Sequence, residues 1–173
     1  MPKAKNQVEF ETELVISTTG SGWHFLLVGN EIVADLGFKD KYRRVVCTIN
    51  NGEPFQCALL PWGDLFYIIV SKKKRMGLVA GDTVKVLLVK DESKYGLPMP
   101  EEFEEVLKQD PEGDVMFHAL TAGKQRSILY LLSHAKDIDV RIHQGLLIVD
   151  HLKTNGGKIV DKLLYAELKR PMF

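Results

Sequence analysis

The hydrophobic period changes once along this chain of 173 residues, and that change limits the folds open to it. Residues 8–16 alternate mostly apolar side chains with glutamates, which is the period of a strand with one buried face. In the second half the apolar residues recur every three or four positions, which is the period of an amphipathic helix. The stretch 90–100 between the two patterns is charged first and then rich in proline and glycine. The pattern therefore predicts a β-barrel domain over 1–92, a linker over 93–99 and a helical domain over 100–173.

The first domain contains about six strand-like runs with short helical connections, which is typical of a small barrel or sandwich. Its clearest local signal is an Asn51-Gly52 pair between two β-prone runs, 43–50 and 53–60. This pair favours a type I′ turn with Asn51 and Gly52 as its two central residues. The resulting register places the side chains of Cys47 and Cys57 on opposite faces of the hairpin. We therefore expect two reduced thiols without a bridge between them.

The second domain is predicted to be a bundle of three to five helices. Pro100 suits the first turn of a helix, with Glu101 and Glu102 near the positive end of the helix dipole. Thr121 suits the N-cap of another helix. Residues 138–152 fit a helix, although the start of this segment alone would also fit a strand.

Charge and composition exclude several classes of protein. The 23 Lys and Arg residues balance 23 Asp and Glu residues, so the chain lacks the bulk positive charge that drives non-specific binding to nucleic acid or anionic lipid. No apolar run approaches the roughly 20 residues that span a bilayer. The N-terminus has no apolar stretch behind its lysines, as a signal peptide would. We therefore expect a cytoplasmic protein.

No set of residues has the spacing of a catalytic, metal or cofactor site. Two cysteines are too few for a four-ligand zinc site, and the histidines show neither HxxxH nor HExxH spacing. The glycine loops at 20–22 and 155–158 lack a phosphate-binding motif. We expect a protein without catalytic residues, metal or cofactor, whose histidines lie at the surface or half-buried. These histidines are His24, His118, His134, His143 and His151.

The strongest local charge feature is a run of four cations at 72–75, on a connection between two predicted strands. Four adjacent cations suit phosphate or another anion, although a solubilising turn is the more common explanation. Cations of the helical half provide a second candidate surface. The candidate anion- or partner-binding residues are Lys72, Lys73, Lys74, Arg75, Arg126, Lys136 and Arg141. Trp23, Trp62 and Tyr67 belong either to the core or to the rim of a groove.

Two sets of motifs resemble known bacterial families. Segment 45–91 contains Thr48-Ile49-Asn50-Asn51-Gly52-Glu53-Pro54-Phe55 and Gly81-Asp82-Thr83-Val84-Lys85-Val86. It is similar to a small β-barrel domain of unknown function found at the front of many bacterial proteins. Segment 99–153 contains Pro100-Glu101-Glu102-Phe103 and Gly123-Lys124-Gln125-Arg126. It resembles the YdeI/OmpD-associated family, also called the bacteriocin-protection family, although Leu131 stands where that family usually carries a tryptophan.

The resemblance implies a fold and two possible functions. The barrel resembles the double-split barrel class, so the expected fold is α+β, with a small double-split-type barrel followed by the helical bundle. The resemblance of the helical half implies protection against antimicrobial peptides or bacteriocins. Because a catalytic set of residues is also missing, we expect a non-enzymatic binding protein with an anionic or protein partner. The barrel class also contains AbrB-like DNA-binding proteins. The alternative function is therefore nucleic-acid binding through residues 72–75 and Arg43-Arg44, which the neutral net charge disfavours.

Overall fold

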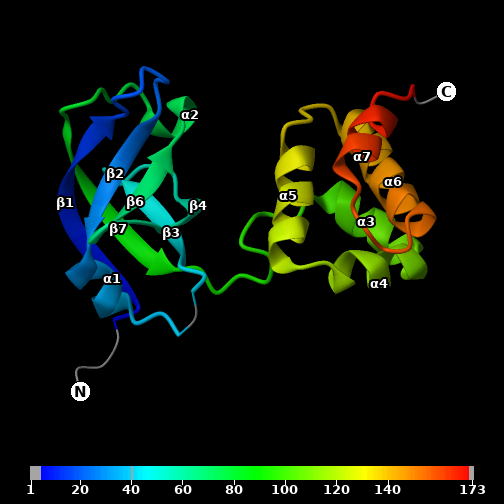
Figure 1. The fold of residues 1–173 in the computed structure, drawn as a ribbon, viewed down its shortest axis with the longest axis horizontal. Coiled ribbons are helices and arrows are strands. Elements are labelled where there is room, and N and C mark those ends of the chain that lie inside the picture. The colour runs from blue at the N-terminus through cyan, green and yellow to red at the C-terminus, as the bar shows by residue number, and fades with distance from the viewer. Residues whose placement is uncertain (1–4, 40, 172–173) are drawn as a thin grey trace. The chain divides into compact units, whose positions relative to one another are not determined.

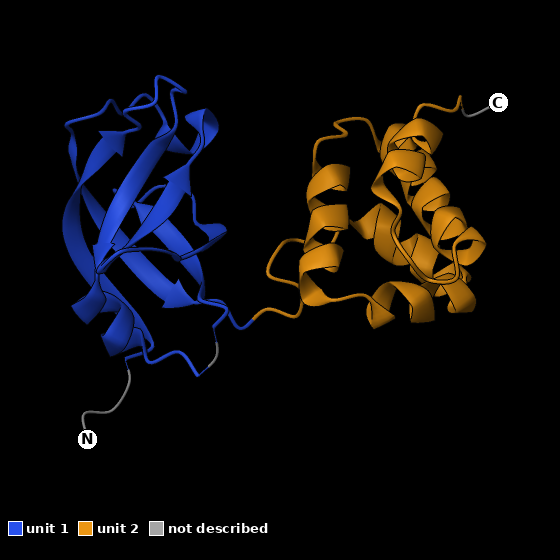
Figure 2. Cartoon of the chain, in the orientation of Figure 1, with its two compact units in different colours: residues 1–92 blue, residues 93–173 orange. Residues whose placement is uncertain are grey.

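The computed structural model describes residues 5–39 and 41–171 (Figure 1). The chain forms two compact units, residues 1–92 and residues 93–173, which Figure 2 shows in different colours. Residues 93–99, the predicted linker, fall within the second unit, where Tyr95, Leu97 and Met99 pack against the helical core. Every helix in the described ranges is too short or too polar to cross a bilayer. The prediction that the N-terminus is not a signal peptide falls partly on residues 1–4, which lie outside the described residues.

The first unit is a nearly closed antiparallel barrel of seven strands. Its elements are β1 (Gln7–Ile16), β2 (His24–Gly29), α1 (Asn30–Leu36), β3 (Arg44–Ile49), β4 (Phe55–Ala58), β5 (Leu60–Trp62), β6 (Leu65–Val70), α2 (Lys72–Arg75) and β7 (Thr83–Lys90). The strand order is β4-β3-β7-β1-β2-β6-β5. The two end strands, β4 and β5, are consecutive in the chain and are joined by the buried Leu59 alone. This short connection holds the two edges of the sheet together, and alternate side chains fill the interior.

The barrel confirms the predicted architecture and adds one strand to the six expected. The sequence predicts only a turn at Pro61-Trp62-Gly63-Asp64, but residues 60–62 form β5 and pair with β6. β5 is the last strand of the sheet order, and an edge strand tolerates a proline because one row of its N–H groups has no partner strand.

The turn between β3 and β4 lies one residue earlier than predicted. Asn50 and Asn51 have φ angles of 49° and 59°, and the N–H of Gly52 donates to the carbonyl of Ile49 at 2.9 Å. The central residues are therefore Asn50 and Asn51, and asparagine tolerates this left-handed conformation. The reason lies in a distant strand. The Asn50 N–H donates to the carbonyl of Lys85, and the Asn50 side-chain oxygen accepts from the Lys85 N–H, both at 2.8 Å.

This shift reverses the prediction for the cysteines. β3 and β4 pair Cys47 with Phe55 and Val45 with Cys57. Because a slip of one residue moves a side chain to the other face, Cys47 and Cys57 lie on the same face of the hairpin, not on opposite faces. Both thiols are free, and Cys47 is fully buried. A hydrogen bond with the Cys57 side chain, together with burial, raises the pKa of the Cys47 thiol far above its ordinary value.

The second unit is a bundle of five helices among the described residues. They are α3 (Glu101–Gln109), α4 (Pro111–Ala119), α5 (Ala122–Ser133), α6 (Ile138–Thr154) and α7 (Asp161–Glu167). α6 contacts each of the other four helices. The predicted N-cap is present, since the Thr121 hydroxyl accepts from the Lys124 N–H. Phe103 and Phe117 meet edge to face at 5.1 Å in the core, and the segment from residue 138 is a helix rather than a strand.

Candidate functional site

The predicted cation run forms α2, a single helical turn between β6 and β7. Ser71 caps the helix, and its hydroxyl accepts from the Lys74 N–H at 3.4 Å. Lys72 and Lys73 are exposed. Lys74 is half-buried, and its Nζ lies 5.3 Å from the centroid of the Phe55 ring, within range of a cation–π contact. Part of the run therefore packs on the barrel.

Arg75 is held by a buried histidine. Its Nη1 lies 3.0 Å from His24 Nε2, and His24 Nδ1 lies 2.8 Å from the carbonyl oxygen of Gly22. Because a carbonyl can only accept, His24 carries its hydrogen on Nδ1 and accepts from Arg75 through Nε2. This contact joins α2 to the start of β2, while the buried Nε of Arg75 finds no hydrogen-bond partner in the described part of the chain. Lys72 and Lys73 are the exposed members of the run.

The other three candidate cations lie in the helical unit and in different places. Arg126 is half-buried on α5, and Lys136 is exposed between α5 and α6. Arg141 Nη2 lies 3.5 Å from Glu102 Oε1, and this partly buried pair joins α6 to α3. The seven candidate residues are therefore divided between the units, with four on α2 and three on α5, α6 and the connection between them.

His151 is a buried residue that the sequence analysis missed. Its Nδ1 donates to Glu167 Oε2 at 2.7 Å, and its Nε2 accepts from the Val160 N–H at 3.0 Å. The Asn155 side chain donates to the His151 carbonyl at 2.8 Å. These bonds join α6, α7 and the connection between them, and both ring nitrogens are occupied. The expectation of surface or half-buried histidines is wrong for His24 and His151, because helical or strand spacing alone does not reveal a buried polar partner.

A second polar pair stabilises the start of α4. Lys153 Nζ lies 2.6 Å from Asp110 Oδ2, while Asp110 Oδ1 accepts from the Gly113 N–H at 2.9 Å. The Lys153 ammonium, aided by the Gly113 N–H, holds the pKa of the Asp110 carboxyl below its usual value. The same contact raises the pKa of Lys153. Asp110 is thus an N-cap with a cationic partner.

A groove of about 320 Å³ lies between α5, α6 and α7. Its floor is apolar, and its rim carries Ser127, Tyr165 and an ion pair. The floor residues are Ile128, Leu131, Ile148, Ile159 and Leu164. The ion pair joins Lys124 Nζ to Asp161 Oδ2 at 3.9 Å, with the side chains 47% and 69% exposed, so it is weak and open to exchange.

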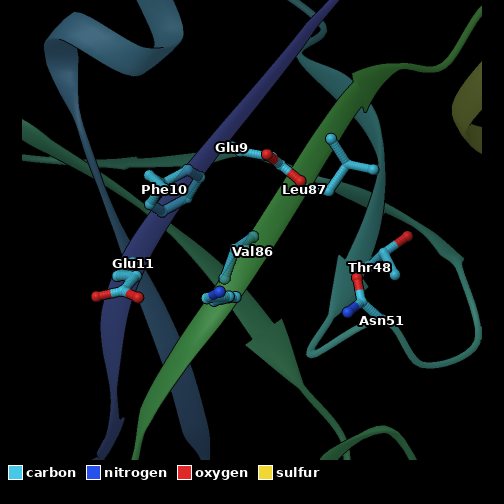
Figure 3. A pocket seen from close by; sticks show the side chains of 8 residues that line it. Glu9, Phe10, Glu11, Thr48, Asn51, Val86 and Leu87 are labelled. Carbon is cyan, nitrogen blue, oxygen red and sulfur yellow. The ribbon is translucent and has the colours of Figure 1, made fainter.

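A hollow of about 280 Å³ lies over β1, β7 and the end of β3 (Figure 3). Glu9 and Glu11 come from β1, and Thr48 and Asn51 lie beyond β7 in Figure 3. The strand register places Glu11 opposite Lys85. These carboxylates are exposed, so the hollow does not supply the water-excluded setting that acid–base catalysis uses. Within residues 5–39 and 41–171, no three His, Cys, Asp or Glu side chains gather to hold a metal ion.

A small, nearly closed barrel is thus followed by an α-helical bundle with an apolar groove between α5, α6 and α7. Residues 10–88 match the family model of a domain of unknown function, DUF1905. Residues 97–153 match the model described as Bacteriocin-protection, YdeI or OmpD-Associated. The two family models therefore match successive segments of the chain, in the order that the motifs predict. No curated protein matches the chain.

Proposed function

We propose that this chain protects bacteria against bacteriocins or related antimicrobial peptides by binding, without catalysing a reaction, and that it does so in the cytoplasm. The match of residues 97–153 to the bacteriocin-protection family carries the proposal. In this proposal the helical unit binds the peptide in the groove between α5, α6 and α7.

The groove has the chemistry of a peptide site. Its apolar floor can take an aliphatic or aromatic side chain, as grooves for amphipathic peptides do. At the rim, a cation of the peptide can replace Lys124 as the partner of Asp161, because the existing pair is long and exposed. Leu131 lies in the floor. Since the family usually carries a tryptophan at this position, the smaller side chain leaves more room in the groove.

The polar pairs of the helical unit support binding over catalysis. His151 uses both ring nitrogens in bonds that join helices, Asp110 caps α4, and Arg141 joins α6 to α3. A general acid or base must exchange protons with a substrate, so groups that hold the fold in this way are poor candidates for the role.

Survival of challenged bacteria tests the proposal. A sensitive host expressing the full chain is exposed to nisin and, separately, to a pore-forming colicin. We expect survival above the empty-vector control for at least one of them. Leu131→Asp, which puts a charge into the apolar floor, should reduce survival toward the vector level, and so should Asp161→Lys, a change at an exposed position. Leu163→Asp is the matched control, since Leu163 is exposed on α7 and outside the groove.

Three results would contradict the proposal. Absence of protection by the unaltered chain would reject the function. If the groove variants keep their helical circular dichroism and protect as well as the unaltered chain, the groove is not the binding site. A loss of protection on changing Lys72 and Lys73 to Ala, accompanied by a salt-dependent gel shift with DNA, would favour the nucleic-acid alternative.

A further inference from the structure

The outer face of the barrel exposes an apolar surface on β2, β5 and β6. Trp62 is 74% exposed and Trp23 53% exposed, so neither belongs to the core. Leu27, Leu65 and Ile69 are also exposed. Clusters of large apolar side chains on a protein surface mark binding sites more often than chance would allow. From the sequence, each tryptophan could belong either to the core or to the rim of a groove. In the structure, Trp62 lies on a rim.

This surface is hollowed into a pocket of about 360 Å³. Phe25 and Leu27 from β2 and Tyr67 from β6 line it, and Trp62 from β5 forms part of its rim. The β2–β6 register pairs Leu27 with Tyr67. The rings of Phe25 and Tyr67 meet edge to face at 5.3 Å, which fixes both against the sheet. These contacts make the pocket a preformed feature of the strand pairing.

The chemistry of the lining is uncharged throughout. Its remaining residues are Ile16 and three hydroxyl residues, Ser17, Thr18 and Thr19, from the turn after β1. Ser17 Oγ and Thr19 Oγ1 lie 2.8 Å apart, and Thr19 Oγ1 donates to Ser21 Oγ at 3.0 Å. One side of the pocket is thus aromatic and aliphatic, and the turn supplies hydroxyl donors and acceptors. A charged ligand would lose its hydration here without gaining an opposite charge.

We propose that this pocket binds a small uncharged molecule with a flat apolar ring system and one hydroxyl or carbonyl end. The ring system lies against Trp62 and the Phe25–Tyr67 pair, and the polar end faces the hydroxyls of the turn. The volume falls within the range of small-molecule sites, which combine apolar walls with few polar groups. This site belongs to the other unit and is independent of the proposed peptide groove.

Two fluorescent probes with the same rings test the proposal on the full chain. N-phenyl-1-naphthylamine is uncharged, and 8-anilinonaphthalene-1-sulfonate adds a sulfonate. We expect saturable fluorescence enhancement with the uncharged probe and at least tenfold weaker binding of the sulfonate. Trp62→Ala should weaken binding of the uncharged probe about tenfold, because it removes one aromatic wall. Trp23→Ala is the matched control and should change affinity less than twofold.

Nuclear magnetic resonance locates the probe directly. The chain has two tryptophans and hence two indole N–H signals, which the two variants assign. Titration with the uncharged probe should shift the Trp62 signal and leave that of Trp23 nearly unchanged. Lack of saturable binding, equal affinity of Trp62→Ala, or tighter binding of the sulfonate would overturn the proposal. So would sedimentation showing a stable dimer that excludes the probe, since a second copy would then cover the face.

Discussion

The two units of this chain are held together in different ways. In the barrel, backbone hydrogen bonds between strands that are distant in sequence connect the structure, and inward side chains fill it. In the helical unit each helix satisfies its own backbone, so cohesion between helices depends on side chains. The apolar core supplies most of it, and pairs such as His151–Glu167 and Lys153–Asp110 join segments far apart in the chain. Changes to single polar side chains should therefore affect the helical unit more than the barrel.

The chain provides a separate signal for each unit. Both tryptophans lie in the barrel, so tryptophan emission follows barrel unfolding. Circular dichroism at 222 nm is dominated by the helices α3 to α7 of the second unit. Denaturant titrations monitored by both signals can show which unit a substitution weakens.

The largest effect is expected from His151→Ala. This substitution leaves the Glu167 carboxylate and the Val160 N–H without their partner and opens a cavity between α6 and α7. We expect a loss of about 3 kcal/mol in the free energy of unfolding of the helical unit. The 222 nm transition should move to lower denaturant, and the tryptophan transition should stay in place. His134→Ala, at an exposed position, is the control, and an equal effect of both variants would contradict the account.

Two glycine substitutions separate close helix packing from helix propensity. A Cβ at Gly113 would collide with Val149, where α4 and α6 approach each other. Gly113→Ala should therefore destabilise the helical unit by about 2 kcal/mol. A Cβ at Gly123 on α5 would meet only Nη2 of Arg126, at an ordinary contact distance of 4.0 Å. Gly123→Ala should instead stabilise that unit by about 0.5 kcal/mol, because alanine favours a helix. If the 222 nm midpoint shifts in the same direction for both variants, the proposed close packing of α4 and α6 is wrong.

Alkaline pH should act on the barrel through Cys47. The raised pKa keeps this thiol protonated in the folded state, whereas in the unfolded chain it ionises above its ordinary value of 9.0. Above pH 9 the folded state then binds more protons than the unfolded chain. The free energy of unfolding of the barrel is therefore full below pH 9 and falls as the pH rises, by about 1 kcal/mol per pH unit. Cys47→Val removes the thiol and should flatten this part of the profile. Parallel profiles for the two proteins between pH 9 and 10, measured by tryptophan emission, would refute the assignment.

Acid should act on the helical unit through Asp110, with the smallest effect. The lowered pKa means that the folded carboxylate holds its charge below the unfolded value of 3.8. This contribution to stability is present above that pH and is lost as pH falls through the lowered folded value. Asp110→Asn should reduce the acid sensitivity of the 222 nm transition without changing the tryptophan transition. An unchanged acid profile in the variant would show that the pair with Lys153 does not contribute.

The sequence predicts the order of the two families and most helices and strands, because hydrophobic period and turn residues are local signals. It misplaces the β3–β4 turn by one residue, since Asn50 is selected by hydrogen bonds to Lys85 on a distant strand. Burial of His151 depends on Glu167 and on the Val160 N–H, which no local pattern reveals. The groove and the aromatic pocket are also assembled from several elements. The sequence suggests that Trp62 could lie on a rim, but it does not show which other residues line the pocket.

The central claim is that the helical unit holds the peptide site, and hydrogen–deuterium exchange of the full chain with saturating nisin tests it most directly. We predict slower exchange in 124–131 and 159–165, the segments that border the groove, and unchanged exchange in 72–75 and in β2 and β6. Leu131→Asp should abolish the slowing, whereas Leu163→Asp should preserve it. Slower exchange confined to the barrel, or none in either unit, would contradict the claim.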